Sequence, residues 1–398
     1  MRKSNLLLAG LLLLQTSAFA EDATKKDSTE GFQFTTVKEI PITSIKNQNR
    51  SSTCWSFSGQ SFFEAELLRI GKGEHDLSEM FVVHHCMTDR AERYVRLHGD
   101  NSFSPGGSFY DVAYCWRNYG VVPQAAMPGI MYDDTLHVHN ELDAVAEAYT
   151  NAIAKGHFKK LTKVWKEGLS AIYDTYLGEL PEKFTYNGKE YTPKSLAESL
   201  ELNMDDYVSI TSYTHEPFYS SFILEIPDNW RLSKSYNLPM DEMMTVIKNA
   251  VENGYTLAWG ADVSETGFTR DGIGVMPDAD KGAELTGSDM AHWTGLSATD
   301  KRKELTSKPL PEMKITQEMR QEAYDNWETT DDHGMLIYGI ANDQNGKPYY
   351  MVKNSWGTKN KYKGTWYISE AFVAYKTMNF LVHKDAIPKS IKKKMGIK

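Results

Sequence analysis

The sequence predicts an α+β protein in which a helical lobe precedes a lobe built on an antiparallel sheet. Three early segments repeat apolar residues at helical spacing: Cys54–Ile70, Leu77–Val95 and Phe109–Tyr119. Later segments have the short apolar runs of strands: Phe222–Ile226, Thr256–Val263, Met335–Ala341, Tyr349–Val352 and Trp366–Ile368. Because helices come first and strands later, the two kinds of structure are expected to form separate layers.

Turn and capping residues mark the ends of these elements. Ser52 and Thr53 are candidate N-caps for the first helix, and Gly71 is a stop signal after it. The run Asn-Asp-Gln-Asn-Gly at 342–346 predicts a hairpin between two of the strands. Residues 239–253 between two other strands have the spacing of an amphipathic helix.

The two ends of the chain are expected to lie outside a folded domain that spans 38–385. Residues 1–20 combine a basic start, an apolar run and a small-x-small cleavage site, the pattern of a secretory signal peptide. We therefore expect an exported protein, periplasmic or secreted, with a flexible leader at 21–37. The lysine-rich segment 386–398 is expected to be a solvated basic tail. Within the domain, 135–205 is rich in helix-forming residues and is expected to be a helical insertion.

The composition of the chain excludes several classes of protein. The formal net charge of −9 opposes general affinity for nucleic acid, and no segment after the signal peptide is apolar enough to span a membrane. Only three cysteines occur, so the chain is not a disulfide scaffold. Cys86 and Cys115 are expected to be either buried thiols or one bridge. His84 and His85 beside Cys86 are not expected to bind a metal, because adjacent helical residues point in different directions; no cofactor is expected.

The third cysteine, Cys54, has the setting of a nucleophile. It begins a helix, whose N-terminus favours a thiolate over a thiol, and it follows a polar loop through which the sulfur can be reached. Gln48 lies six residues upstream. Its side-chain amide and the Cys54 backbone N–H can both donate to a developing oxyanion. The sequence thus predicts a thiol acyl-transfer site at Cys54.

A base and its orienting group lie on the predicted hairpin. His333 heads one strand and Asn354 follows the next, and antiparallel pairing brings these two ends together. The Asn354 side chain accepts the imidazole N–H and leaves the ring free to take a proton from Cys54. Trp356 is placed to cover that hydrogen bond from water. We therefore expect a thiolate–imidazolium pair of Cys54 and His333 that carries out acyl transfer.

The order of these motifs resembles that of the papain-type cysteine peptidases. Five motifs carry the resemblance: Gln48-x5-Cys54-Trp55, Leu77-Ser78-Glu79, Gly106-Gly107, Asp332-His333 and Asn354-Ser355-Trp356-Gly357. The resemblance implies a papain-like two-lobe fold whose catalytic residues are Cys54, His333, Asn354 and Gln48. The substrate-binding residues that it implies are Gly106, Gly107 and Trp356.

Departures from papain point to one branch of this family. Cys54 and His333 lie roughly twice as far apart as the about 130–150 residues typical of papain and the cathepsins. The long spacing and the run Glu92-Arg93-Tyr94 resemble the bleomycin hydrolase and aminopeptidase C branch. That resemblance implies peptide substrates, aminopeptidase action and a homo-oligomer, specifically a hexamer. It also implies a chain end that lies in the cleft, so the lysine tail is expected to control access to Cys54.

Two alternatives stay open at the level of sequence. One is an endopeptidase of the same fold, because the lysine-rich tail does not match the usual ending of the branch. The other is a non-catalytic, oligomeric binding protein that keeps the papain fold. The second alternative leaves the complete set of Gln, Cys, His and Asn without a purpose.

Overall fold

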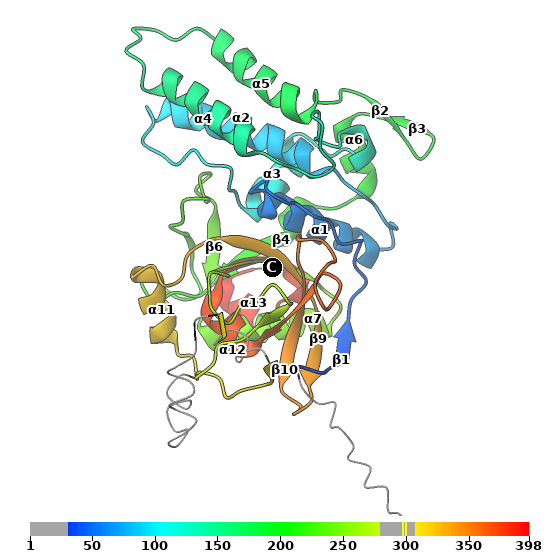
Figure 1. Ribbon diagram of the computed structural model, residues 1–398, viewed down its shortest axis with the longest axis vertical. Helices are drawn as coiled ribbons and strands as arrows, with labels where there is room; N and C mark the ends of the chain where they lie inside the picture. Colours follow the sequence, from blue (N-terminus) through cyan, green and yellow to red (C-terminus); the bar gives the residue numbers. More distant parts are fainter. Residues whose placement is uncertain (1–30, 279–296, 298, 301–306, 398) are drawn as a thin grey trace, which may run out of the picture. The chain divides into compact units, whose positions relative to one another are not determined.

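The fold is organised around the contact of one helix with one sheet. Helix α1 (Cys54–Arg69) packs against strands β7 (Leu257–Ala261) and β9 (His333–Asp343). The helices formed by residues 79–200 lie on one side of α1, and most strands lie on the other together with the later helices (Figure 1). The structure is a computed structural model that describes residues 31–278, 297, 299–300 and 307–397. Within these residues the α+β class predicted from the sequence is confirmed.

The helical layer consists of elements that the sequence signals locally. Its members are α2 (Glu79–Arg96), α3 (Phe109–Asn118), α4 (Asn140–Ala154), α5 (Val164–Leu177) and α6 (Pro193–Leu200). The predicted bounds of α1, α2 and α3 agree with the structure to within two residues. Helix α2 begins where the Ser78 hydroxyl accepts a hydrogen bond from the backbone N–H of Phe81 at 3.1 Å, which satisfies an otherwise unpaired amide. By contrast, Thr53 at the start of α1 forms no side-chain cap.

The segment 135–205 holds α4, α5 and α6 together with a hairpin that the sequence analysis missed. Strands β2 (Phe184–Tyr186) and β3 (Lys189–Tyr191) form this two-stranded sheet. Their turn residues Asn187 and Gly188 have φ angles of 48° and 77°. Asn-Gly with two positive φ values is the preferred two-residue hairpin turn, so a signal was present in the sequence.

In the described residues the main sheet has ten strands, and it contains both parallel and antiparallel pairs. Neighbouring strands follow the order β5-β6-β4-β12-β7-β9-β10-β11-β8, and β1 pairs with β9 in addition. Strands β9 and β10 form the predicted antiparallel hairpin. The strands not yet given are β1 (Phe34–Glu39), β4 (Tyr207–Thr211), β5 (Ser221–Ile223), β6 (Lys234–Asn237), β8 (Ile273–Gly274), β10 (Pro348–Lys353), β11 (Thr365–Ser369) and β12 (Thr377–His383). The central strand β12 was not predicted, because it is buried on both faces and its alternation of polar and apolar residues ends after four positions.

Four further helices of the described residues cover the sheet or follow it. They are α7 (Met240–Glu252), α11 (Gln317–Asp325), α12 (Glu370–Lys376) and α13 (Lys389–Met395). Three short 3₁₀ turns lie at η1 (Gln124–Ala126), η2 (Met204–Asp206) and η3 (Lys384–Ala386). Helix α7, predicted from its amphipathic pattern, buries Met243, Val246, Ile247, Ala250 and Val251.

The prediction of a solvated C-terminal tail is wrong. Residues 389–395 form helix α13, whose Ile391 and Met395 are 4% and 6% exposed and join the core beside α7. Asn249 of α7 donates a hydrogen bond to the carbonyl oxygen of Ala386 at 2.7 Å just before this helix. The high lysine content led to the wrong prediction. Two apolar residues four positions apart are enough to bury one face of a short helix.

The prediction of a flexible leader over 21–37 is wrong in its last part. Residues 34–37 belong to β1, which pairs with β9. The ring of Phe34 stacks on Tyr367 at a centroid distance of 3.8 Å, and this burial of aromatic surface fixes the segment. Residues 21–30 and the proposed signal peptide lie outside the described residues.

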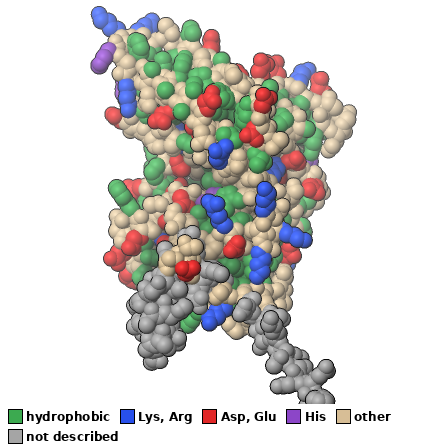
Figure 2. All heavy atoms as spheres, in the orientation of Figure 1, with side chains coloured by type: hydrophobic (Ala, Val, Ile, Leu, Met, Phe, Trp, Pro, Cys, Tyr) green, Lys and Arg blue, Asp and Glu red, His purple; other side chains and the backbone are tan. Residues whose placement is uncertain are grey.

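The structure also bears on the remaining cysteines, on membrane-spanning helices and on the surface charge. Cys86 and Cys115 are free, fully buried thiols, so the bridged alternative is excluded. No helix in the described part of the chain is long and apolar enough to cross a membrane. On the face shown in Figure 2, acidic and basic side chains are interspersed. That face therefore lacks the continuous basic stripe of a nucleic-acid-binding surface.

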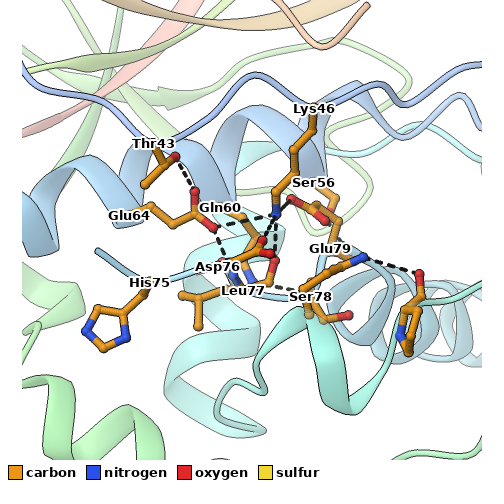
Figure 3. A network of polar contacts seen from close by, with 12 residues as sticks. Thr43, Lys46, Ser56, Gln60, Glu64, His75, Asp76, Leu77, Ser78 and Glu79 are labelled. Atoms are coloured by element: carbon orange, nitrogen blue, oxygen red, sulfur yellow. Dashed lines mark hydrogen bonds and ion pairs between the residues drawn. The ribbon is translucent and has the colours of Figure 1, made fainter. Parts of the chain in front are cut away.

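A buried ionic network connects α1 and α2 with the loop that precedes α1 (Figure 3). The Lys46 ammonium lies 2.6 Å from Glu79, 2.7 Å from Asp76 and 3.7 Å from Glu64. Burial by itself lowers the pKa of Lys46, but the Glu79 and Glu64 carboxylates outweigh it and hold that pKa above its usual value. Glu64 also accepts a hydrogen bond from Thr43 at 2.6 Å, and Thr43 accepts one from Lys353 of β10 at 3.0 Å. The network therefore reaches from both helices to the sheet.

Replacing Lys46 with Met should destabilise the fold strongly. The change leaves the buried Glu64 and Glu79 carboxyl groups without their cation, and breaking a buried pair from one side costs about 3–5 kcal/mol. Urea unfolding followed by circular dichroism measures this change in the free energy of unfolding. The matched control is Lys183→Met, which breaks an exposed pair with Glu190 and should change stability by less than about 1 kcal/mol. Equal effects in both variants would contradict the role given to the network.

Candidate active site

The predicted nucleophile and base line the same cleft. Cys54 is the first residue of α1 and His333 is the first residue of β9, so the packing of this helix on this strand brings them to one place. The helical side of the cleft is lined by Trp55, Gly107, Ser108 and Phe109. The opposite side is lined by Ile226, Asp228, Gly260, Asp331, Asp332, Gly334 and Asn379.

The close approach of α1 to β9 requires a glycine at position 334. A Cβ atom there would lie 2.7 Å from the hydroxyl oxygen of Ser58 and 3.4 Å from the carbonyl oxygen of Cys54. Any larger residue would push the start of α1 away from the strand. The backbone N–H groups of Gly334 and Trp55 lower the pKa of the Cys54 thiol, which favours the thiolate.

Burial opposes a charge on either member of the pair taken singly. It raises the pKa of the Cys54 thiol to about 12, and the neighbouring carboxylates of Asp331 and Asp228 act in the same direction. Burial lowers the pKa of His333 to about 4, although its hydrogen bond to Asn354 acts in the opposite direction. Transfer of the proton from sulfur to imidazole creates both charges at once, and their attraction offsets part of this cost. The thiolate–imidazolium pair stays a prediction.

Asn354 and Trp356 hold His333 from two sides. The Nε2 atom of His333 lies 2.8 Å from the Oδ1 atom of Asn354, across the hairpin of β9 and β10. This bond fixes the ring and leaves Nδ1 as the nitrogen available for proton transfer. The Trp356 ring lies over the imidazole with a centroid distance of 4.7 Å, and both side chains are largely removed from water. The sequence prediction brought these three residues together correctly.

Gln48 is oriented by Ser355, a residue that the sequence analysis included in a motif but gave no role. The backbone N–H of Gln48 donates to the carbonyl oxygen of Ser355 at 2.8 Å. The Ser355 hydroxyl donates to the Oε1 atom of Gln48 at 2.6 Å. Because Oε1 is occupied, the Nε2 donor of the amide stays available for another acceptor, and its place in an oxyanion hole stays a prediction.

The two predicted substrate-binding glycines fill tight gaps beside the cleft. A Cβ at Gly107 would lie 2.8 Å from the Trp55 ring, and a Cβ at Gly106 would lie 2.0 Å from the Oδ2 atom of Asp228. Gly107 lines the cleft, whereas Gly106, Gln48 and Trp356 are absent from the described residues that line it. The glycines therefore set the positions of Trp55 and Asp228, and their backbone pairing with a substrate stays a prediction.

The acidic side chains of the cleft were not among the site residues predicted from the sequence. Asp228, Asp331 and Asp332 all line it. The Asp-Asp-His run was visible in the sequence, but only its second aspartate was used, as part of a motif. Asp228 lies far from the motifs along the chain, and nothing in its neighbours signals a place beside Cys54.

The fold and this site together define a papain-like cysteine peptidase. A family model described as Peptidase C1-like matches residues 13–278 and 285–397, so the chain belongs to that family. Among solved structures, PepW from Lactobacillus rhamnosis HN001 superposes with a TM-score of 0.66 at 19% sequence identity, covering 91% of this chain and 84% of that one. This likeness supports the shared fold.

Curated relatives cover most of the chain. It is 24% identical to Aminopeptidase C of Streptococcus thermophilus, over 86% of this chain and 80% of the relative. Aminopeptidase C of Listeria monocytogenes is 23% identical to this chain, over 89% of this chain and 83% of the relative. Aminopeptidase G of Lactobacillus delbrueckii subsp. lactis is 22% identical to this chain, over 88% of this chain and 83% of the relative.

Replacing Ser355 with Ala should lower kcat by about fivefold, because the loss of one hydrogen bond worth about 1 kcal/mol frees the Gln48 amide to rotate. Gln48→Ala should lower kcat by about 10²–10³, the usual effect of removing an oxyanion donor. Steady-state kinetics on a fluorogenic aminoacyl substrate measures both values. If Ser355 acts through Gln48, the double variant should be no slower than Gln48→Ala. Multiplied losses in the double variant would contradict this positioning role.

Proposed function

We propose that the protein is a cysteine aminopeptidase that hydrolyses the first peptide bond of peptides with a free N-terminus. The observation that carries the proposal is the His333–Asn354 hydrogen bond at the cleft that holds Cys54. Relatives named aminopeptidase C over most of this chain's length support the exopeptidase form of this chemistry.

The geometry supports a two-step acyl transfer. The Cys54 sulfur attacks the scissile carbonyl carbon while its proton moves to Nδ1 of His333. The resulting oxyanion accepts hydrogen bonds from the Gln48 amide and from the Cys54 backbone N–H. His333 then donates the proton to the leaving amine, and the peptide bond breaks. Water, deprotonated by His333, attacks the thioester, which releases the amino acid and restores the thiol.

The two alternatives have less support. A non-catalytic binding protein would not need His333 fixed by Asn354, nor Gln48 fixed by Ser355. An endopeptidase would use the same bond-breaking groups, but the named relatives favour cleavage from the N-terminus.

Cys54→Ala should abolish hydrolysis, with a loss of up to about 10⁶-fold, because no other thiol of the described residues lines the cleft. Iodoacetamide should label Cys54 of the native protein and inactivate it, as shown by mass spectrometry. Cys115→Ala is the matched control and should keep its activity, since that thiol is fully buried outside the cleft.

The exopeptidase assignment is tested with one peptide in two forms, with a free and with an acetylated N-terminus. We expect kcat/KM to be at least about tenfold higher for the free form, corresponding to one charge-assisted hydrogen bond. Faster cleavage of the acetylated peptide would establish the endopeptidase alternative instead.

We also propose export and homo-oligomeric assembly. The signal-peptide pattern of residues 1–20 supports export to the periplasm or the medium, and the resemblance to the bleomycin hydrolase branch supports a hexamer. N-terminal sequencing of the mature protein should begin at Glu21, and light scattering after size exclusion should give six subunits. An unprocessed N-terminus would contradict export, and a monomer would contradict assembly.

A further inference from the structure

We propose that Asp331 and Asp228 form the anionic site that binds the free α-ammonium group of the peptide substrate. The proposal deepens the aminopeptidase function and rests on it, since only an enzyme that acts at the N-terminus needs such a site. It adds two residues that bind substrate and set the requirement for an unblocked first residue.

The position of the nucleophile determines where this ammonium group must lie. In a substrate, the amine nitrogen is two bonds from the reacting carbonyl carbon, a separation of about 2.5 Å. That carbon must approach the attacking sulfur to about 3–3.5 Å. The ammonium group therefore lies within about 6 Å of the Cys54 sulfur. Asp228 and Asp331 line the same cleft, and both act electrostatically on the Cys54 thiol.

Asp228 is a carboxylate held in place by its surroundings. Its Oδ1 atom accepts a hydrogen bond from Ser104 at 3.3 Å and lies 3.6 Å from the buried guanidinium of Arg90. Arg90 also donates to the carbonyl oxygen of Gly106 at 2.5 Å. The Oδ2 atom of Asp228 packs over Gly106, where a Cβ would lie 2.0 Å away. This arrangement fixes one oxygen and leaves Oδ2 as an acceptor for a ligand.

Asp331 is the acceptor that the protein leaves open. It is partly buried in the cleft, and it accepts no hydrogen bond and forms no ion pair within the described part of the chain. Burial raises its pKa to about 8, and the charges of Asp228 and Asp332 add to that effect. Asp332 differs, because it accepts hydrogen bonds from the Val263 backbone at 2.9 Å and from Ser264 at 2.5 Å.

A primary ammonium group suits these two carboxylates. Their mutual repulsion is unfavourable in the empty cleft and is relieved when a cation lies between them. An ammonium group has three N–H donors and can bond to both carboxylates at once. A metal ion is a poorer fit, since no group of three His, Cys, Asp or Glu side chains in the described residues could hold one.

The C-terminal tail does not take this place in the structure. Through Ile397, no described tail residue lines the cleft. Helix α13 is instead held beside α7 by Ile391 and Met395, and Lys394 pairs with Glu242 of α7 at 2.5 Å. The expectation that the lysine tail controls access to Cys54 therefore lacks support within this chain, and the cleft's own aspartates supply the negative charge.

The test compares kcat/KM for alanyl and leucyl aminomethylcoumarin amides with their N-acetylated forms. Neutral side chains ensure that the only cation in the substrate is the α-ammonium group. Asp331→Asn should lower the ratio of free to acetylated kcat/KM by about 10–100-fold, the effect expected for one charge-assisted hydrogen bond. Asp331→Glu, which keeps the charge, should recover part of the ratio. Asp228→Asn should also lower it, and thermal melting reports whether each variant is folded.

Two control variants test whether the effect is specific to Asp331 and Asp228. Asp332→Asn removes a neighbouring carboxylate that is already bonded, and its ratio should fall by less than about threefold. Truncation of residues 396–398 moves the terminal carboxylate and should leave the ratio unchanged. An unchanged ratio in Asp331→Asn, or loss of the ratio on truncation, would overturn the proposal. So would a selective loss of activity on acetylated peptides with Arg or Lys, because the aspartates would then recognise a basic side chain.

Binding without turnover provides a second measurement. In Cys54→Ala, isothermal titration with the tetrapeptide Ala-Ala-Ala-Ala and its acetylated form should give at least about tenfold tighter binding of the free form. Asp331→Asn in that background should remove the difference. If the wild-type enzyme cleaves neither form, the proposed function fails. If it prefers the free form and Asp331→Asn does not alter that preference, only the present inference fails.

Discussion

The close contact of α1 with β9 is the constraint on which the active site depends. Cys54 begins the helix and His333 begins the strand, so their mutual position is set by how closely these two elements pack. Gly334 permits that packing, because a side chain there would meet Ser58 and the Cys54 backbone. The backbone N–H of the same residue lowers the pKa of the Cys54 thiol. One small residue thus serves both packing and chemistry.

Buried polar groups extend this constraint to the rest of the site. Lys46 lies two positions before Gln48, and Lys353 directly precedes Asn354; both lysines belong to the network around Glu64. Lys353 is 6% exposed, and this burial lowers its pKa to about 8. Such a network requires every partner in place, since an unpaired buried charge is costly. The oxyanion donor and the histidine partner are therefore anchored through the same set of charges.

Local chemistry explains which parts could be predicted from the sequence. Helices α1, α2 and α3 and the hairpin of β9 and β10 carry their own periodicity, caps and turn residues. The proximity of His333 and Asn354 followed from the hairpin, whereas that of Cys54 depends on the packing of α1 against β9. Strand β12 could not be predicted in this way, because it is buried on both faces and its place comes from tertiary pairing with β4 and β7. Asp228 is similar: its position depends on Arg90 and Gly106, which are remote in the chain.

The acidic groups of the cleft also bear on how the nucleophile becomes reactive. In the empty site, Asp331 and Asp228 oppose formation of the Cys54 thiolate, since like charges repel. An ammonium group bound between the two carboxylates would neutralise this effect and place a positive charge near the sulfur. The thiolate would then be favoured mainly when a substrate with a free amine is present. Recognition of the N-terminus and activation of Cys54 would be coupled through one electrostatic field, and a blocked peptide would fail at both steps.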